Sequence, residues 1–168
     1  MLSAKIARRS ILPAAILMLV SASISSGCRK GRDASFIGTF PMGERVQVGP
    51  LVYQILDSSW RNELGSGGRT PKDRYLFVRM SITNSSGSPV SVPGLTIEGG
   101  GKTFAEVSED MDKVDNWFGL LRTIQPSQTE QGWIVFDAPM TAYKLNLSDG
   151  GEVGSEKSAH VDIPVSLE

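Results

Sequence analysis

Beyond residue 44, hydrophobic and polar residues alternate with the period of two that is typical of half-buried β-strands. The clearest case is residues 74–83, where every second residue from Leu76 to Ile82 is apolar. Clusters of turn-forming residues, such as Asn84-Ser85-Ser86-Gly87, separate the runs. The pattern predicts further short strands at residues 46–48, 51–56, 89–92, 95–99, 102–104, 132–138, 143–149 and 160–165. Residues 89–92 and 95–99 form either a strand pair or one broken strand, so we count about 7–8 strands. Without helices between them, these strands predict an all-β fold, an antiparallel β-sandwich.

Two long connections interrupt this series of strands. Residues 57–74 are polar and contain Gly65-Ser66-Gly67-Gly68, which predicts a surface loop. Residues 106–121 are acidic at first and then apolar, and they are the only stretch with the character of a helical turn. In the last predicted strand, Pro164 cannot donate a backbone hydrogen bond, which favours an edge or terminal position.

The first 27 residues have the layout of a secretory signal peptide. Lys5, Arg8 and Arg9 form a basic start, residues 11–24 are mostly apolar, and small residues follow. The apolar run is shorter than the roughly 20 residues that span a bilayer comfortably. The Arg8-Arg9 pair also occurs in twin-arginine signals. The sequence therefore allows export either by the general secretory (Sec) route or by the twin-arginine route.

The single cysteine, Cys28, follows this signal directly. Ser26-Gly27-Cys28 resembles a bacterial lipobox, in which the thiol takes a diacylglycerol and the signal is cleaved before the cysteine. Buried acyl chains would then hold the protein at the extracytoplasmic side of a membrane in the cell envelope. We therefore expect a signal peptide at 1–27, a tether at 28–42 after the lipidated Cys28, and the sandwich at 43–168. The alternative is an ordinary signal peptide with an unmodified cysteine.

Charge and cysteine content exclude several classes of protein. The formal net charge is −1, and because three of the 17 basic residues lie in the first 27, the rest of the chain is at −4. A mildly acidic domain without a basic patch is not expected to bind nucleic acid. One cysteine can form neither an internal disulfide nor a cysteine-based zinc site.

Three stretches, residues 71–86, 121–129 and 131–145, together with the opening from Gly43 to Tyr53, resemble the DUF4352 family. That family covers telokin-like and immunoprotective-antigen-like extracellular domains of bacterial lipoproteins. The resemblance runs from about residue 44 to 150, and it departs from the family at Ser127, where glycine is usual. It implies an immunoglobulin-like β-sandwich at the cell surface and supplies no catalytic residues.

Few residues are candidates for chemistry. Asp110, Asp112 and Asp115 could contribute to a Ca²⁺ site, but Val114 and Asp115 do not fit the EF-hand template. The only histidine, His160, has no nucleophile motif to serve, so we expect neither an enzyme nor a cofactor.

Large aromatic residues raise a different possibility. Trp117 and Phe118 could form an exposed contact for a partner, or they could close one end of the sandwich, and Trp60 presents the same choice. The sequence thus favours a lipid-anchored binding module, with loops 57–74 and 105–121 contacting an envelope protein or ligand. The alternative is a domain that binds Ca²⁺ or a small ligand through the acidic loop at 106–115.

Overall fold

The computed structural model describes residues 35–120, 122–152 and 154–165. The predicted signal peptide and residues 28–34 of the predicted tether, including Cys28, lie outside the described residues. The strands are β1 (Phe36–Pro41), β2 (Arg45–Val48), β3 (Leu51–Arg61), β4 (Arg74–Asn84), β5 (Val90–Ser91), β6 (Thr96–Gly99), β7 (Lys102–Ala105), β8 (Thr123–Ile124), β9 (Thr129–Ala138), β10 (Tyr143–Ser148) and β11 (Ser158–Ile163). The described residues include no helix long and apolar enough to cross a membrane.

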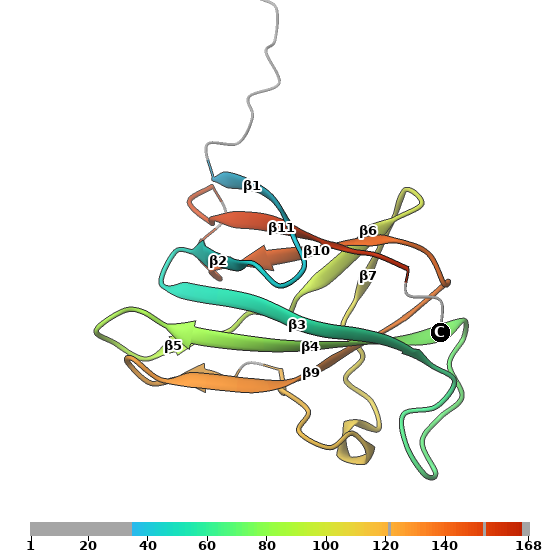
Figure 1. Cartoon of the computed structure of the whole chain (residues 1–168). Helices are drawn as coiled ribbons and strands as arrows, with labels where there is room; N and C mark the ends of the chain where they lie inside the picture. The colour runs from blue at the N-terminus through green and yellow to red at the C-terminus, as the bar shows by residue number, and fades with distance from the viewer. Residues whose placement is uncertain (1–34, 121, 153, 166–168) are drawn as a thin grey trace, which may run out of the picture. The chain divides into compact units, whose positions relative to one another are not determined.

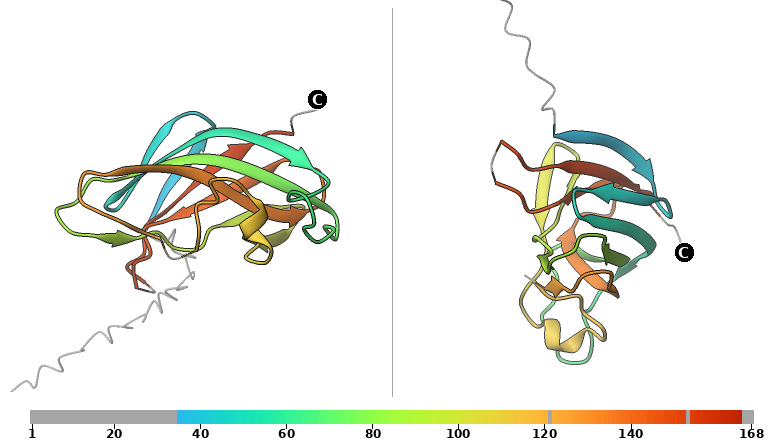
Figure 2. Two further views of the ribbon diagram at one scale, coloured as in Figure 1. Left: turned by 90° about the horizontal axis from the view of Figure 1, so that it is seen from below. Right: turned by 90° about the vertical axis from the view of Figure 1, so that its left-hand side faces the viewer.

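Two sheets pack face to face as a β-sandwich (Figures 1 and 2). One sheet has the order β1-β11-β10-β6-β7, and the other has the order β2-β3-β4-β9. The short strands β5 and β8 pair with each other outside both sheets. The predicted all-β, immunoglobulin-like class is confirmed, with more strands than expected because several of them are only two to four residues long.

The predicted alternation is confirmed in the long strands. In β4, Leu76, Val78, Met80 and Ile82 are fully buried between the sheets. Ile134 and Phe136 from β9 lie beside them, and Leu145, Leu147, Val161 and Ile163 face them from the other sheet. One face of each strand thus supplies the core, because side chains alternate between the two faces of a sheet.

Two predicted boundaries need correction. Residues 36–41, placed in the tether, form β1, which pairs with β11 in parallel, whereas every other strand pair is antiparallel. The predicted loop at 57–74 begins only after Arg61, because a bulge between Ile55 and Asp57 lets β3 continue along β4. The helical turn expected in the connection at 106–121 is confirmed as a single 3₁₀ turn, Met111–Lys113 (η1).

The position of the last strand also differs from the expectation. Pro164 follows the end of β11, which lies between β1 and β10 and is not an edge strand. The missing backbone donor of Pro164 therefore ends the strand and does not disturb the ladder.

A second apolar cluster lies on the outer face of the four-stranded sheet. Residues 106–120 and Leu64 cover the alternate face of β4 and β9, where Tyr75, Phe77 and Val135 are buried. Met111, the first residue of the 3₁₀ turn, and Val114, which follows the turn, complete the cluster. The long connection is therefore a packed third layer over one end of the sheet.

The same connection also covers the free edge of β9. The backbone N–H of Phe118 donates to the carbonyl of Trp133 at 2.8 Å, and the N–H of Trp133 donates to Asn116 at 2.9 Å. Further along, the N–H of Val107 donates to the carbonyl of Val135 at 2.8 Å. Covering an edge in this way protects it from pairing with another chain.

Candidate functional site

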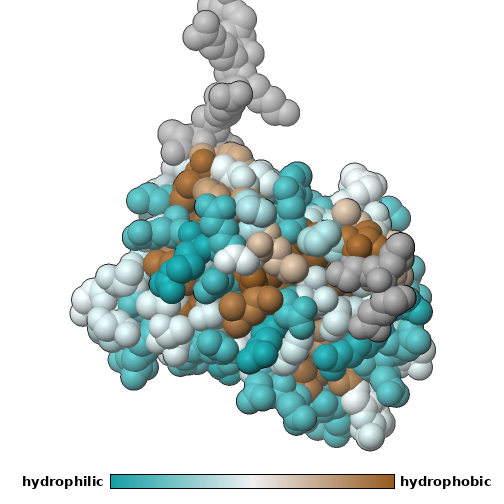
Figure 3. Space-filling view, viewed as in Figure 1, coloured by the Kyte–Doolittle hydropathy of each residue, from teal (hydrophilic) through white to brown (hydrophobic). Residues whose placement is uncertain are grey.

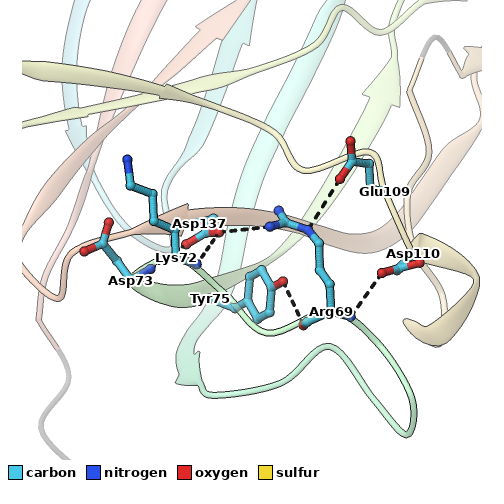
Figure 4. A network of polar contacts seen from close by, with 7 residues as sticks. All are labelled: Arg69, Lys72, Asp73, Tyr75, Glu109, Asp110 and Asp137. Carbon is cyan, nitrogen blue, oxygen red and sulfur yellow. Dashed lines mark hydrogen bonds and ion pairs between the residues drawn. The ribbon is translucent and has the colours of Figure 1, made fainter.

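The two predicted contact loops come together at one end of the sandwich (Figure 4). The backbone N–H of Arg69, in loop 62–73, donates to the Asp110 carboxylate at 3.0 Å. The Arg69 guanidinium lies 3.6 Å from the carboxylate of Glu109. A Cβ on Gly65 would come within 2.5 Å of the Lys113 carbonyl, so glycine permits this close approach. Loops 62–73 and 106–115 therefore form one continuous surface, which we call the two-loop surface.

Asp137, near the end of β9, fixes loop 62–73 in place. Its carboxylate accepts hydrogen bonds from the backbone N–H groups of Lys72 at 2.8 Å and Asp73 at 3.0 Å. It also pairs with the Arg69 guanidinium at 3.3 Å. The Tyr75 hydroxyl donates to the carbonyl of Arg69 at 3.1 Å, which fixes the same loop at a second point (Figure 4). The loop is thus ordered by one carboxylate that is only 13% exposed.

Replacing Asp137 with alanine is expected to release loop 62–73 and lower the free energy of unfolding by about 2 kcal/mol, as for lost hydrogen bonds to a charged group. Hydrogen exchange should report faster exchange at the amides of Lys72 and Asp73. Asp73→Ala is the matched control, because its exposed side chain is hydrogen-bonded to no other described residue. Similar exchange in both variants would contradict this role for Asp137.

Beside this network lies a cavity of about 430 Å³. Its charged lining residues include Arg69, Glu109 and Asp137. The end of β7 and the segment that follows it, residues 103–109, form the other wall. The third carboxylate, that of Glu106, accepts a hydrogen bond from the backbone N–H of Leu95 at 2.5 Å. Burial raises the pKa of Glu106 to about 7, although the Leu95 N–H opposes the shift. Glu106 itself therefore gains its negative charge only near neutral pH.

The raised pKa of Glu106 gives the fold a pH dependence with a definite sign. In the unfolded chain this carboxyl releases its proton near pH 4.5, whereas in the folded protein it does so near pH 7. Between these values the folded state binds more protons, so stability should fall as pH rises from 5 to 7 and then level off. We expect a loss of about 3 kcal/mol, which is the free-energy equivalent of a pKa shift from 4.5 to about 7.

Glu106→Gln should remove this part of the pH dependence and stabilise the protein at pH 8, because the amide keeps an acceptor for Leu95 without a charge. Thermal unfolding across pH 5–8 would measure it. Glu109→Gln is the matched control, since the Glu109 side chain is 78% exposed. If Glu106→Gln unfolds with the same pH profile as the parent protein, the raised pKa is wrong.

The candidate calcium ligands bind the protein itself. Asp110 accepts from the backbone of Arg69, and Asp112 pairs with the adjacent Lys113 at 2.7 Å. This pairing lowers the pKa of Asp112. Asp115 is exposed. Within residues 35–120, 122–152 and 154–165, no three His, Cys, Asp or Glu side chains lie close enough together to hold a metal ion.

The candidate aromatic contacts have different positions. Phe118 is only 1% exposed and belongs to the main core, so it cannot form a surface patch. Trp117 is half-buried against the outer cluster. Trp60 is also half-buried, and its ring lies 6.2 Å from that of Tyr143. The structure thus supports the alternative in which these aromatics close one end of the sandwich.

His160 lies on the outer face of the five-stranded sheet, far from the two-loop surface in the fold. The ring of Phe36 packs edge-on against it at 4.7 Å, and Asn146 is its partner across the ladder. Arg69 and Asp137, which organise the site, were not singled out by the sequence, whereas Glu106 belongs to the acidic loop at 106–115 that was. A detectable signal was Asp137 itself, a carboxylate that directly follows the apolar run 133–136 near the end of β9.

Several solved structures share this fold. YcdA of Bacillus subtilis, named as a candidate lipoprotein, is 17% identical with a TM-score of 0.57, and the match covers 74% of this chain and 39% of that one. This chain therefore spans well under half the length of that protein. YjhA of B. subtilis is 14% identical with a TM-score of 0.56, covering 73% and 99% of the two chains. The secreted protein MPT63 of Mycobacterium tuberculosis is 14% identical with a TM-score of 0.53, covering 74% and 96%.

At these identities the likeness shows the fold alone. No curated protein matches the chain in sequence. A family model described as "Domain of unknown function (DUF4352)" matches residues 40–159, which begin within β1 and end within β11. This match covers most of the chain and nearly the whole sandwich, and the protein therefore belongs to the DUF4352 family.

Proposed function

We propose that this protein is a lipid-anchored binding module on the extracytoplasmic side of a bacterial membrane. Its signal-peptide layout and the Ser26-Gly27-Cys28 sequence support export and acylation. The family resemblance to extracellular domains, and the secreted protein among the structural neighbours, agree with that location. The sequence carries no catalytic motif, so we propose binding without catalysis.

The observation that carries the binding role is the ordering of the two-loop surface. Loops 62–73 and 106–115 come from distant parts of the chain, yet Arg69 contacts both Asp110 and Glu109. Their exposed tips, including Ser66 and Asp112, rise from a rigid β-sheet. Loops that a rigid scaffold holds in one arrangement are the usual place for recognition. We propose that this surface, with its adjoining cavity, contacts an envelope protein or ligand.

Site-specific photo-crosslinking in cells tests this proposal. Replacing all of loop 106–120 would remove Val107, Met111, Val114 and Phe118 from buried positions and so would unfold the domain. Single photoreactive residues at Ser66 and Asp112 avoid this problem. Matched controls at Gly87 and Pro89 are equally exposed and lie beyond the opposite end of β4.

One crosslinked product from Ser66 and Asp112, absent from Gly87 and Pro89, would support the two-loop surface. A product found only at Gly87 and Pro89 would place the binding surface at the other end and overturn this assignment. If no position yields a protein, the ligand is a small molecule or polymer, and Asp137→Ala should then weaken its binding.

Acylation of Cys28 is tested separately. We expect the protein extracted from membranes to begin at Cys28 and to carry the mass of a diacylglycerol with its acyl chains. Intact-mass spectrometry checks both features at once. The control is Cys28→Ser, which should be released from the membrane fraction. A mature protein that begins at another residue without added lipid would contradict the prediction.

A further inference from the structure

The start of β1 exposes two large apolar side chains to solvent. Phe36 and Ile37 are 43% and 48% exposed, the two most exposed large apolar side chains that the structure describes. They are adjacent in sequence, whereas Leu56, Leu120 and Met140 are scattered over other elements. Figure 3 shows hydrophobic colour on the surface at the end of the domain where β1 begins. We call Phe36 and Ile37 the β1 patch.

The β1 patch lies close in sequence to the proposed lipid attachment. Only residues 29–35 separate Phe36 from Cys28, and such a stretch reaches at most about 25 Å when fully extended. A surface held this near to a bilayer meets it as an intramolecular event, at an effective concentration in the millimolar range. Apolar contacts that are too weak to bind the free protein to lipid are then sufficient to favour one orientation of the anchored domain on the bilayer.

The charge of the segment between Cys28 and Phe36 also favours contact with a lipid surface. The intervening segment contains Arg29, Lys30 and Arg32 against a single acid, Asp33. Basic residues next to a lipid anchor are attracted to anionic headgroups. The loop beside the start of β1 is net acidic, with Asp149, Glu152 and Glu156 against Lys157, so attraction to anionic headgroups comes from the tether alone.

We propose that the β1 patch rests on the lipid surface and orients the anchored domain. Phe36 and Ile37 lie in the headgroup region, where a large apolar side chain is favourable without crossing the bilayer. Figure 1 shows the start of β1 and the 3₁₀ turn of loop 106–115 at opposite ends of the domain. This orientation points the two-loop surface away from the membrane. The inference rests on the proposed lipid anchor.

Paramagnetic relaxation in NMR tests it without relying on cellular acylation. Residues 28–168 contain the whole sandwich, and Cys28 is the only thiol, so it can be coupled to a maleimide lipid. The coupled protein is placed on nanodiscs of phosphatidylcholine and phosphatidylglycerol that carry a gadolinium lipid. We expect severalfold stronger relaxation at the amides of Phe36 and Ile37 than at Ser66 and Asp112.

The double variant Phe36→Ser/Ile37→Ser is the matched comparison, because both side chains are exposed and their loss leaves the core intact. It should reduce the difference between the two ends of the domain severalfold. Equal relaxation at both ends, or an unchanged difference in the variant, would overturn the proposal. Broadening of β1 without lipid, with the mass of a dimer, would identify a second copy as the occupant and also overturn it. Failure of acylation in cells would instead be seen in the intact mass.

Discussion

Replacing Phe118 with alanine is expected to lower the free energy of unfolding by about 3–5 kcal/mol, the usual range for removing a buried phenylalanine. The ring is 1% exposed and lies in the main core with Ile124, although it follows a long irregular connection. The Arg122 guanidinium lies 4.5 Å from the ring centre and covers its outer face. Urea denaturation of the purified domain would measure the loss.

Trp117→Ala is the comparison that separates a core residue from a contact residue. Trp117 is larger, but it is half-buried, and its indole Nε1 is a buried donor without a hydrogen-bond partner. Removing an unsatisfied donor offsets part of the lost packing, so a smaller loss of stability is expected than for Phe118. A larger loss for Trp117→Ala than for Phe118→Ala would show that the outer cluster, and not the main core, holds loop 106–120.

A glycine opposite Phe118 explains why this packing is possible. A Cβ on Gly132 would lie 2.8 Å from the Asn116 carbonyl and 2.9 Å from the Cα of Phe118. Only a residue without a side chain lets residues 116–118 run directly beside β9. The sequence shows this glycine inside a strong strand pattern, but not which segment approaches it.

The strands that were predicted well are those whose evidence is local. In β4 and β10 the alternation of apolar and polar residues is complete within one strand, and one face is buried against the other sheet. The turn after β4 was also predicted, because Asn84 and Ser86 have side chains that bond to nearby backbone. Such elements can be predicted without knowing which distant segments they contact.

The elements that were missed depend on distant partners. β1 has little alternation of its own and forms because β11 offers a parallel edge, some 120 residues later in the chain. β3 continues past Asp57 because a bulge restores its register with β4. The packing of residues 106–120 over β4 and β9 also depends on distant partners. Both faces of β4 carry apolar residues, and the sequence alone does not show that one face packs against the other sheet and the other face against residues 106–120.

One departure from the family pattern has a physical reading in the structure. Ser127 has φ 61°, in the left-handed region that glycine adopts at little cost. Its N–H donates to the Asn84 carbonyl at 2.9 Å, so the turn keeps this conformation despite the side chain. The glycine usual in the family therefore corresponds to a backbone requirement, and not to a functional group.

Asn84→Ala is expected to lower the free energy of unfolding by about 3–4 kcal/mol, because a buried and fully satisfied polar network loses its centre. Asn84 is 0% exposed at the end of β4. Its amide donates to the carbonyls of Ser88 at 2.8 Å and Ile124 at 2.9 Å. Its side-chain oxygen accepts from the N–H of Ser86 at 2.9 Å and from the Ser86 hydroxyl at 2.8 Å.

These bonds join the turn after β4 to β8, which is 40 residues away, so alanine would leave several buried groups without partners. Thermal and urea unfolding would measure the effect. Ser85→Ala is the matched control, since its hydroxyl makes one exposed bond to Pro50, and a change below about 1 kcal/mol is expected. Asn84→Asp keeps the acceptor for Ser86 but replaces both donors with a buried negative charge, so it should destabilise the domain at least as much as alanine at pH 7. A stability for Asn84→Asp close to that of the parent protein would show that the acceptor alone holds the turn, and that the link to β8 contributes little.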